Sequence, residues 1–161
     1  MLLLLAPIGP LYVGSAFTFL AENCAMISAD NTLCPCGQTT AKGQAMRYSD
    51  CCGRYVENFD ACPAPDAERL MRSRYSAFVR ENAHYLQQTW HPSQRPTDLD
   101  FDTAARWLGL QIKDFVVTGE STAEVEFVAR YRVAGRAVRL HERSRFVHES
   151  GRWYYVDGDQ Y

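Results

Sequence analysis

Four cysteines near the start of the chain form two tight pairs with the spacing of a metal site. Cys34 and Cys36 flank a proline, and after 14 further residues Cys51 and Cys52 follow as neighbours. Four thiolates that a turn brings together match a closed tetrahedral Zn²⁺ site, which needs four soft ligands and no open position. A disulfide within either pair would be strained, whereas cross-pairing between the pairs stays open. The spacing therefore predicts a structural zinc site.

The same residues resemble the SEC-C motif, a small zinc-binding module. The shared pattern is Cys-Pro-Cys-Gly and then Cys-Cys, with Tyr48 ahead of the second pair. The segment between the pairs is longer than is usual for the motif, by an insertion around residues 39–44. The resemblance implies that the zinc ligands are Cys34, Cys36, Cys51 and Cys52.

The SEC-C resemblance also implies a protein partner. In the secretion motor SecA, from whose tail the motif is named, the module engages a chaperone, and this analogy favours a docking or adaptor role. The basic residues Lys42, Arg47 and Arg54 would give nucleic acid only a weak, salt-dependent attraction. A net charge of −2 gives no further reason to expect nucleic acid.

The composition is that of a globular protein. Hydrophobic residues make up 47% of the 161 residues, which excludes a disordered chain and allows one domain with a core plus a small appendage. All six cysteines precede residue 63. This distribution favours a reducing compartment and a metal module over a secreted disulfide scaffold. We therefore expect a cytoplasmic protein with no membrane segment.

The chain begins with an apolar stretch that carries no charge before Glu22. The stretch has no basic start, and prolines and glycines interrupt it, which disfavours a signal peptide and a membrane-spanning helix. A native start at Met26 would make the first 25 residues an artefact or an extension. A signal peptide or anchor stays the alternative, so residues 1–30 are treated as an extension whose native status is open.

A stiff linker at Cys62-Pro-Ala-Pro65 divides the rest of the chain. No helix can cross these prolines, because each fixes its own backbone and restricts the residue before it. We therefore place the zinc-binding module in residues 31–57 and a second domain in residues 64–161.

Helical patterns follow the linker at residues 66–80, 83–90 and 98–109. Asn82 is a candidate cap for the second helix, and the third is expected to begin at Asp98 or Asp100 and to end at Gly109. At 100° per residue the first helix places an arginine within an apolar stripe. The residues of this stripe are Ala67, Leu70, Met71, Arg74 and Phe78.

After the helices the hydrophobic period changes to two. Strands are predicted at residues 110–118, 122–133, 137–148 and 152–157. The connections between them are short, which indicates an antiparallel meander. Helices followed by a sheet are typical of an α+β domain, in which the helices cover one face of a curved sheet.

The third predicted strand places a carboxylate on its core face, because Glu142 alternates in step with Ser144 and Phe146. A buried carboxylate needs a partner. Arg74, within the apolar stripe of the first helix, is the obvious one, and we hypothesise an Arg74–Glu142 ion pair. The opposite face of the strand carries a basic ladder that is expected to face solvent or a partner: Arg139, His141, Arg143 and Arg145.

Two interpretations of this ion pair stay open. It either fixes the helix on the sheet or forms the polar floor of a small-molecule pocket. An enzyme would use Glu142 as a base with Tyr75 or His91 as a donor, although a nearby arginine lowers the pKa of a carboxylate and makes it a poor base. The expected pocket residues are Arg74, Tyr75, Trp90, Trp107, Glu142 and Ser144, with Trp153 as a further wall.

Five segments together resemble the YchJ family of bacterial proteins: residues 70–78, 89–93, 126–130, 141–146 and 153–158. The resemblance implies a cystatin-type, nuclear-transport-factor-two-like α+β domain that follows a SEC-C module. It implies a fold and a metal but no activity. We therefore expect a zinc-binding docking or adaptor protein. The alternative is a small-molecule-binding protein, or an isomerase-like or hydratase-like enzyme that uses the cavity of the α+β domain.

Overall fold

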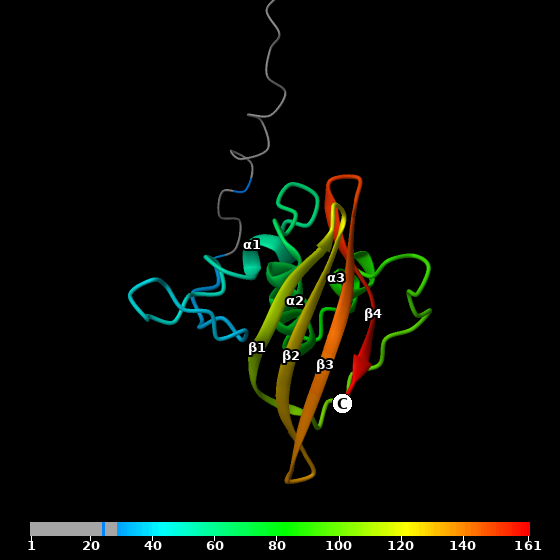
Figure 1. Cartoon of the computed structure of the whole chain (residues 1–161). Coiled ribbons are helices and arrows are strands. Elements are labelled where there is room, and N and C mark those ends of the chain that lie inside the picture. Colours follow the sequence, from blue (N-terminus) through cyan, green and yellow to red (C-terminus); the bar gives the residue numbers. More distant parts are fainter. Residues whose placement is uncertain (1–23, 25–28) are drawn as a thin grey trace, which may run out of the picture.

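The computed structural model describes Cys24 and residues 29–161. The predictions for the apolar start lie outside the described residues. The described part contains α1 (Gly53–Val56), α2 (Ala67–Val79), α3 (Ala83–Gln88), β1 (Arg106–Gly119), β2 (Thr122–Val133), β3 (Arg136–Glu149) and β4 (Arg152–Gln160), as Figure 1 shows. No helix in this part is long and apolar enough to cross a membrane.

The strands form one antiparallel sheet in sequence order, as the period-two pattern predicts. β2 has the predicted bounds, and the other three strands are longer than predicted. Two hairpin turns each contain a pair of residues with positive φ, which are Ala134 and Gly135 in the first and Ser150 and Gly151 in the second. Such turns match the twist of the strands that they join, so each strand pairs directly with the next.

The third predicted helix, at residues 98–109, is wrong. Asp102 accepts a hydrogen bond from the backbone N–H of Ala104 at 2.9 Å, which turns the chain without starting a helix. β1 begins at Arg106 and takes the last third of the segment, where Trp107 packs on Tyr131 of β2 at a ring-centroid distance of 5.0 Å. The glycine expected to end the helix has a φ of +153° and lies at a bulge in β1. Cross-strand packing therefore overrides the local capping signals.

Helix α2 lies across one face of the sheet and contacts β1, β2 and β4 (Figure 1). Asp66 caps its start by accepting a hydrogen bond from the N–H of Arg69 at 2.7 Å. Its predicted apolar stripe faces the core, but Ser73 and Ser76, which were expected to lie off this stripe, are also fully buried. The hydroxyl of Ser73 is 2.7 Å from that of Tyr85 on α3, so a second layer of chain covers this side of α2.

The cysteine module lies against α2 on this second side. Arg80, which ends α2, stacks over the ring of Tyr48 at 3.9 Å and forms an ion pair with Asp30 at 2.5 Å. Arg72 donates a hydrogen bond to the carbonyl of Cys36 at 3.5 Å. The module and the α+β domain share one hydrophobic core. The predicted bounds of the two domains stay a prediction.

Cys24 and Cys62 form a disulfide that the sequence analysis did not predict. The bond joins the segment before the module to the proline linker after it. Arg54 of α1 donates a hydrogen bond to the sulfur of Cys24 at 3.4 Å. Four of the six cysteines are therefore free, as expected for a metal module, and the other two are paired in a disulfide.

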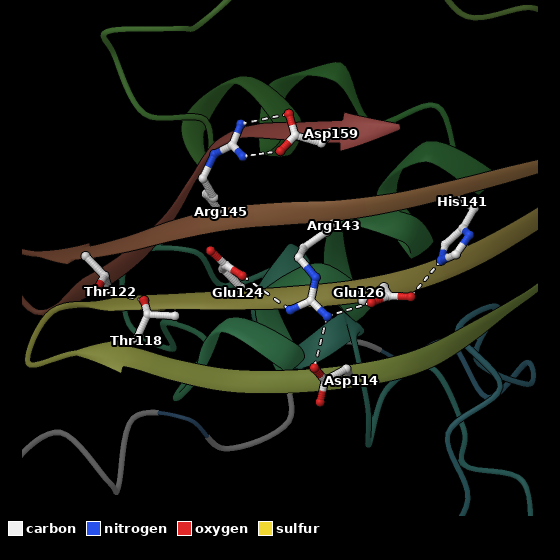
Figure 2. A network of polar contacts seen from close by, with 9 residues as sticks. All are labelled: Asp114, Thr118, Thr122, Glu124, Glu126, His141, Arg143, Arg145 and Asp159. Atoms are coloured by element: carbon white, nitrogen blue, oxygen red, sulfur yellow. Dashed lines mark hydrogen bonds and ion pairs between the residues drawn. The ribbon is translucent and has the colours of Figure 1, made fainter. Parts of the chain in front are cut away.

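The basic ladder of β3 lies on the outer face of the sheet, away from α2, and carboxylates pair with three of its members, His141, Arg143 and Arg145 (Figure 2). Arg143 bonds to Glu126 at 2.6 Å, to Asp114 at 3.0 Å and to Glu124 at 3.3 Å. The other ion pairs of this face are His141–Glu126, Arg145–Asp157 and Arg145–Asp159. The outer face is therefore a matched network of charges around His141, Arg143 and Arg145, whereas Arg139 lies opposite Arg130 of β2 and has no ion pair with a described residue.

We expect the Arg143→Met variant to melt close to the wild-type temperature despite the loss of three ion pairs. Exposed ion pairs add little to the free energy of unfolding, because water and salt screen them. Thermal unfolding at low and high salt measures this. A variant that melts far below the wild type at both salt concentrations would show that the network is essential to the sheet.

Candidate metal centre and ligand pocket

The four cysteines of the two pairs converge on one point. Their sulfur atoms all lie within 4.8 Å of one another. The distance is 3.5 Å from Cys34 to Cys36, 3.6 Å from Cys36 to Cys51 and 4.0 Å from Cys51 to Cys52. Four sulfurs at about 2.3 Å from a central ion form a tetrahedron with edges of about 3.8 Å. None of these four cysteines is in a disulfide, so the cluster has the dimensions of a tetrathiolate metal site.

Local backbone structure builds this cluster from two turns. Gly37, with a φ of +69°, lets the chain reverse directly after Cys36, and its N–H bonds to the carbonyl of Cys34 at 3.1 Å. The second pair immediately precedes α1, whose first residue, Gly53, bonds through its N–H to the carbonyl of Tyr48 at 2.8 Å. Each pair of sulfurs is therefore fixed by a turn that needs a glycine.

The cluster is closed to solvent. The exposed fractions of its residues are 6% for Cys34, 0% for Cys36, 4% for Cys51 and 1% for Cys52. The hydroxyl of Ser76 on α2 is 3.7 Å from the sulfur of Cys34 and covers one side. A metal bound here would have no open position for a substrate, which is the arrangement of structural sites.

Crowding perturbs the acidity of the four thiols. Hydrogen bonds from the other three thiols, chiefly that of Cys36, lower the pKa of Cys34. Hydrogen bonds to Cys34 and then to Cys36 raise the pKa of Cys51 and of Cys52. Without a metal ion, the raised pKa keeps the thiols of Cys51 and Cys52 protonated. A bound divalent cation would allow all four sulfurs to be thiolates. The donor set fits a soft metal ion.

A second candidate site is a cavity of about 280 Å³ between α2 and the inner face of the sheet. All six residues that the sequence analysis expected in a pocket line it: Arg74, Tyr75, Trp90, Trp107, Glu142 and Ser144. The remaining described residues of the lining are Met71, Phe78, Phe127, Ala129, Leu140, Tyr155 and Gln160. Trp153 does not line the cavity and packs on His148 instead, at a ring-centroid distance of 5.1 Å.

The predicted Arg74–Glu142 ion pair does not form, although both side chains reach the same cavity. Arg74 donates through Nη1 to the carbonyl of Leu86 at 2.8 Å and to the hydroxyl of Thr89 at 2.7 Å. The aromatic ring of Tyr155 lies 4.6 Å from the guanidinium carbon. The arginine is thus held by α3, by the residue that follows it and by an aromatic face, and not by the carboxylate.

Glu142 is held by three uncharged donors. Its oxygen atoms accept hydrogen bonds from the hydroxyl of Ser144 at 2.7 Å, the hydroxyl of Tyr155 at 3.1 Å and the amide of Gln160 at 3.4 Å. Tyr155 therefore touches the arginine with its ring and the carboxylate with its hydroxyl. Tyr155 was not among the expected pocket residues, although period two in the last strand places it on the same face as Trp153.

The donors considered for an enzyme do not support acid–base chemistry in the cavity. His91 is not among the described residues that line the cavity, and its ring bonds to Ser93 at 2.7 Å and to Glu149 at 3.3 Å. Burial raises the pKa of Tyr75 to about 12, which makes its hydroxyl a weak acid at neutral pH. The carboxylate of Glu142 already accepts its three hydrogen bonds from protein groups.

Comparison with known proteins identifies the family to which this chain belongs. The sequence model described as "YchJ, middle NTF2-like domain" matches residues 66–158, which is more than half of the chain. The chain belongs to the YchJ family. Its α+β domain is therefore NTF2-like, as the sequence resemblance implied.

Other YchJ-type proteins are similar over most of their length. A UPF0225 protein of Polaromonas sp. is 61% identical over 127 residues, which cover 78% of this chain and 91% of the relative. A UPF0225 protein of Bordetella pertussis is 58% identical over 127 residues, with the same two coverages of 78% and 91%.

Two solved structures share the fold of this YchJ-family chain. A crystal structure of a SEC-C motif containing protein from Psychrobacter arcticus has a TM-score of 0.69 and 30% identity, and the match covers 80% of this chain and 82% of that one. The solution structure of a SEC-C motif containing protein from Rhodopseudomonas palustris has a TM-score of 0.66 and 32% identity, with coverages of 80% and 98%. The cysteine cluster is consistent with a SEC-C module, as predicted.

Proposed function

We propose that the chain is a small-molecule-binding protein whose N-terminal module is held in place by one structural Zn²⁺ ion. The observation that carries the binding function is Arg74, a buried cation with an exposed fraction of 3% that lies in the wall of a largely apolar cavity. Polar groups that converge in an apolar cavity are typical of ligand sites.

Zinc suits the cluster better than other common metals. Thiolate ligands favour soft or borderline ions, and the hard ions Mg²⁺ and Ca²⁺ prefer oxygen. The four sulfurs would be first-sphere ligands from Cys34, Cys36, Cys51 and Cys52, and the ion would supply the charge that lets them ionise together. Because the cluster is buried, the ion would order the module and take no part in a reaction.

Binding is better supported than catalysis. The described residues that line the cavity include no histidine, cysteine or lysine. The carboxylate of Glu142 is hydrogen-bonded to Ser144, Tyr155 and Gln160, and no described histidine or lysine of the lining stands beside it as a proton donor. The isomerase-like or hydratase-like alternative therefore lacks a suitable pair of acid and base.

The three tryptophans provide a test with a built-in control. Trp90 and Trp107 line the cavity and Trp153 does not. In a screen of small aromatic and aliphatic compounds by ¹H–¹⁵N NMR, we expect binders to shift the indole signals of Trp90 and Trp107 and to leave that of Trp153 in place. If no compound shifts the first two signals, or if binders shift only the third, the cavity is not a ligand site.

A protein-docking role for the zinc module is a second candidate. Residues 39–45 are all exposed and form an ordered hairpin, in which Thr39 is bridged to Ala45 and the N–H of Thr40 bonds to the carbonyl of Gln44 at 2.8 Å. This hairpin projects from the module (Figure 1). The metal would fix the turn behind the hairpin and so present it to a partner.

Photo-crosslinking in living cells tests the docking role. A photoreactive amino acid at Lys42, on the hairpin, is compared with one at Glu120, in the exposed turn between β1 and β2. We expect one dominant protein adduct from position 42, lost in the Cys51→Ser variant and absent from position 120. The same adducts from both positions, or an adduct that survives Cys51→Ser, would contradict docking through the zinc module.

A cytoplasmic location stays part of this proposal, because free thiolates suit a reducing compartment. The Cys24–Cys62 disulfide is the observation against it. Alkylation of thiols while cells are lysed directly into denaturant distinguishes reduced from disulfide-bonded Cys62, which is only 2% exposed in the folded protein. We expect Cys62 to be alkylated, and a disulfide that is already present before lysis would contradict the cytoplasmic location.

A further inference from the structure

We propose that the cavity binds a small monocarboxylate with an apolar or aromatic body, and that its carboxylate bonds to Nε and Nη2 of Arg74. This inference rests on the proposed small-molecule function and adds the chemical class of the ligand. It follows from the donors that Arg74 leaves free, from the charges in the cavity and from the size and chemistry of its walls.

The guanidinium of Arg74 is fixed in orientation, with one edge left over. Its Nη1 atom is used by the carbonyl of Leu86 and the hydroxyl of Thr89. The rings of Trp90 and Tyr155 pack against each other at 5.0 Å and lie on one side of the guanidinium, at 5.0 and 4.6 Å from its central carbon. Only the edge formed by Nε and Nη2 has no hydrogen-bond partner among the described residues.

This free edge faces open volume. Among the described residues, the only fully buried side-chain nitrogen or oxygen that lacks a partner is Oε1 of Gln38. The Nε and Nη2 atoms of Arg74 are therefore not sealed in the core, and Arg74 lines the cavity. Two parallel N–H groups on one edge of a guanidinium match the two oxygens of a carboxylate, which is the strongest common arrangement for this pair.

The charge of Arg74 also calls for an anion. No carboxylate of the described residues lies within ion-pair distance of it. Burial lowers the pKa of Arg74 to about 10, so the side chain is still charged at neutral pH. A buried cation without a contacting anion is costly, and a bound carboxylate would relieve that cost.

Glu142 limits the charge of the ligand. It lies in the same cavity with an exposed fraction of 8%, and three neutral donors hold its carboxylate. A ligand with one negative charge can pair with Arg74 while its uncharged body lies toward Glu142. A ligand with two negative charges would be repelled, because like charges interact strongly where water is scarce. The site therefore favours a carboxylate over a phosphate or a dicarboxylate.

The walls and the volume define the rest of the ligand. The body would pack on Met71, Phe78, Trp107 and Leu140, and the ring of Tyr75 meets that of Trp107 edge-on at 5.5 Å. The cavity of about 280 Å³ lies just below the range of about 300 to 1,000 Å³ that is typical of small-molecule sites. A single ring that bears a carboxylate, such as phenylacetate, has this size.

Calorimetry with matched probes tests the proposal. The probes are phenylacetate, its neutral analogue phenylacetamide, and phenylphosphonate, all compared at one pH at which the phosphonate is a dianion and Arg74 is still charged. We expect phenylacetate to bind at least about tenfold more tightly than either of the others, because only it can form the charge-assisted pair without repulsion. An amide that binds as tightly as the acid would overturn the carboxylate while leaving small-molecule binding intact.

Variants test the role of Arg74 itself. Arg74→Met removes the charge at similar length, and Arg74→Lys keeps the charge but loses the two-pronged edge. We expect phenylacetate affinity to fall at least about tenfold in the first and less in the second, and not to fall in Glu142→Gln, which removes the nearby negative charge. The NMR spectrum of each variant shows whether it is folded.

Unchanged phenylacetate affinity in a folded Arg74→Met protein would overturn the proposal. So would a loss of affinity in Glu142→Gln that exceeds the loss in Arg74→Met. If neither phenylacetate nor any other compound shifts the indole signals of Trp90 and Trp107, both the ligand class and the small-molecule function fail together.

Discussion

Removal of zinc is expected to unfold residues 31–57 and to leave the four-stranded sheet folded. The module has only one short helix, Gly53–Val56, and its buried side chains are largely the four cysteines and Tyr48. Such a segment cannot bury enough apolar surface to fold alone. A structural zinc ion supplies about 10 to 16 kcal/mol of apparent binding free energy at neutral pH, which is folding free energy for the segment that holds it.

Amide hydrogen exchange measures this result before and after chelation. We expect protection to be lost in the module and retained in β2 and β3, which are central in the sheet. The Cys36→Ser variant should behave like the chelated protein. The control is Cys62→Ser, which removes the Cys24–Cys62 disulfide but leaves all four sulfurs of the cluster, and it should keep the metal. Protection that persists in the module after chelation would contradict a structural role for the ion.

The Gly53→Ala variant is expected to lower both the stability of the module and its affinity for zinc. A Cβ atom at Gly53 would lie 2.7 Å from the backbone oxygen of Tyr48 and 2.9 Å from its ring. The backbone of Tyr48 cannot rotate away from the new Cβ as a flexible side chain could. Cys52 and the turn that contains Tyr48 must therefore move apart. Overpacking of this kind lowers the free energy of unfolding by about 1 to 3 kcal/mol. The displacement also changes the positions of the sulfur atoms of Cys51 and Cys52.

Gly43→Ala is the matched control. Gly43 has a φ of +76°, so alanine is strained there, but nothing lies within 4 Å of its added Cβ and the residue is in the exposed hairpin. We expect a smaller loss of stability of about 1 kcal/mol, from backbone strain alone, with no change in zinc affinity. Competition with a metal indicator measures the zinc affinity of both variants. Equal zinc affinity in Gly53→Ala and the wild type would show that the Tyr48 contact does not set the geometry of the cluster.

The sequence predicted those features that depend on local pattern. Two cysteine pairs with glycines behind them are enough to suggest a sulfur cluster, because tight turns fix each pair whatever surrounds them. The helical period of α2 and the period of two in β3 were enough to predict that Arg74 and Glu142 face the same interior space. Period two also predicted the β2 strand with its observed bounds.

The features that were missed depend on contacts between distant parts of the chain. The helix expected up to Gly109 gives way to β1, because Trp107 gains a cross-strand neighbour in Tyr131. The Arg74–Glu142 ion pair is replaced by contacts with Tyr155, whose position depends on how β4 pairs with β3. Ser76 is buried because a separate module covers it. No local pattern contains these partners.

X-ray absorption at the zinc edge, on freshly reduced protein with its metal content determined in parallel, shows whether the four cysteines bind one zinc ion. We expect one zinc per chain, surrounded by four sulfur atoms at about 2.3 Å and by no nitrogen or oxygen. A site with nitrogen or oxygen ligands, or a folded and reduced protein with much less than one zinc per chain, would contradict this expectation.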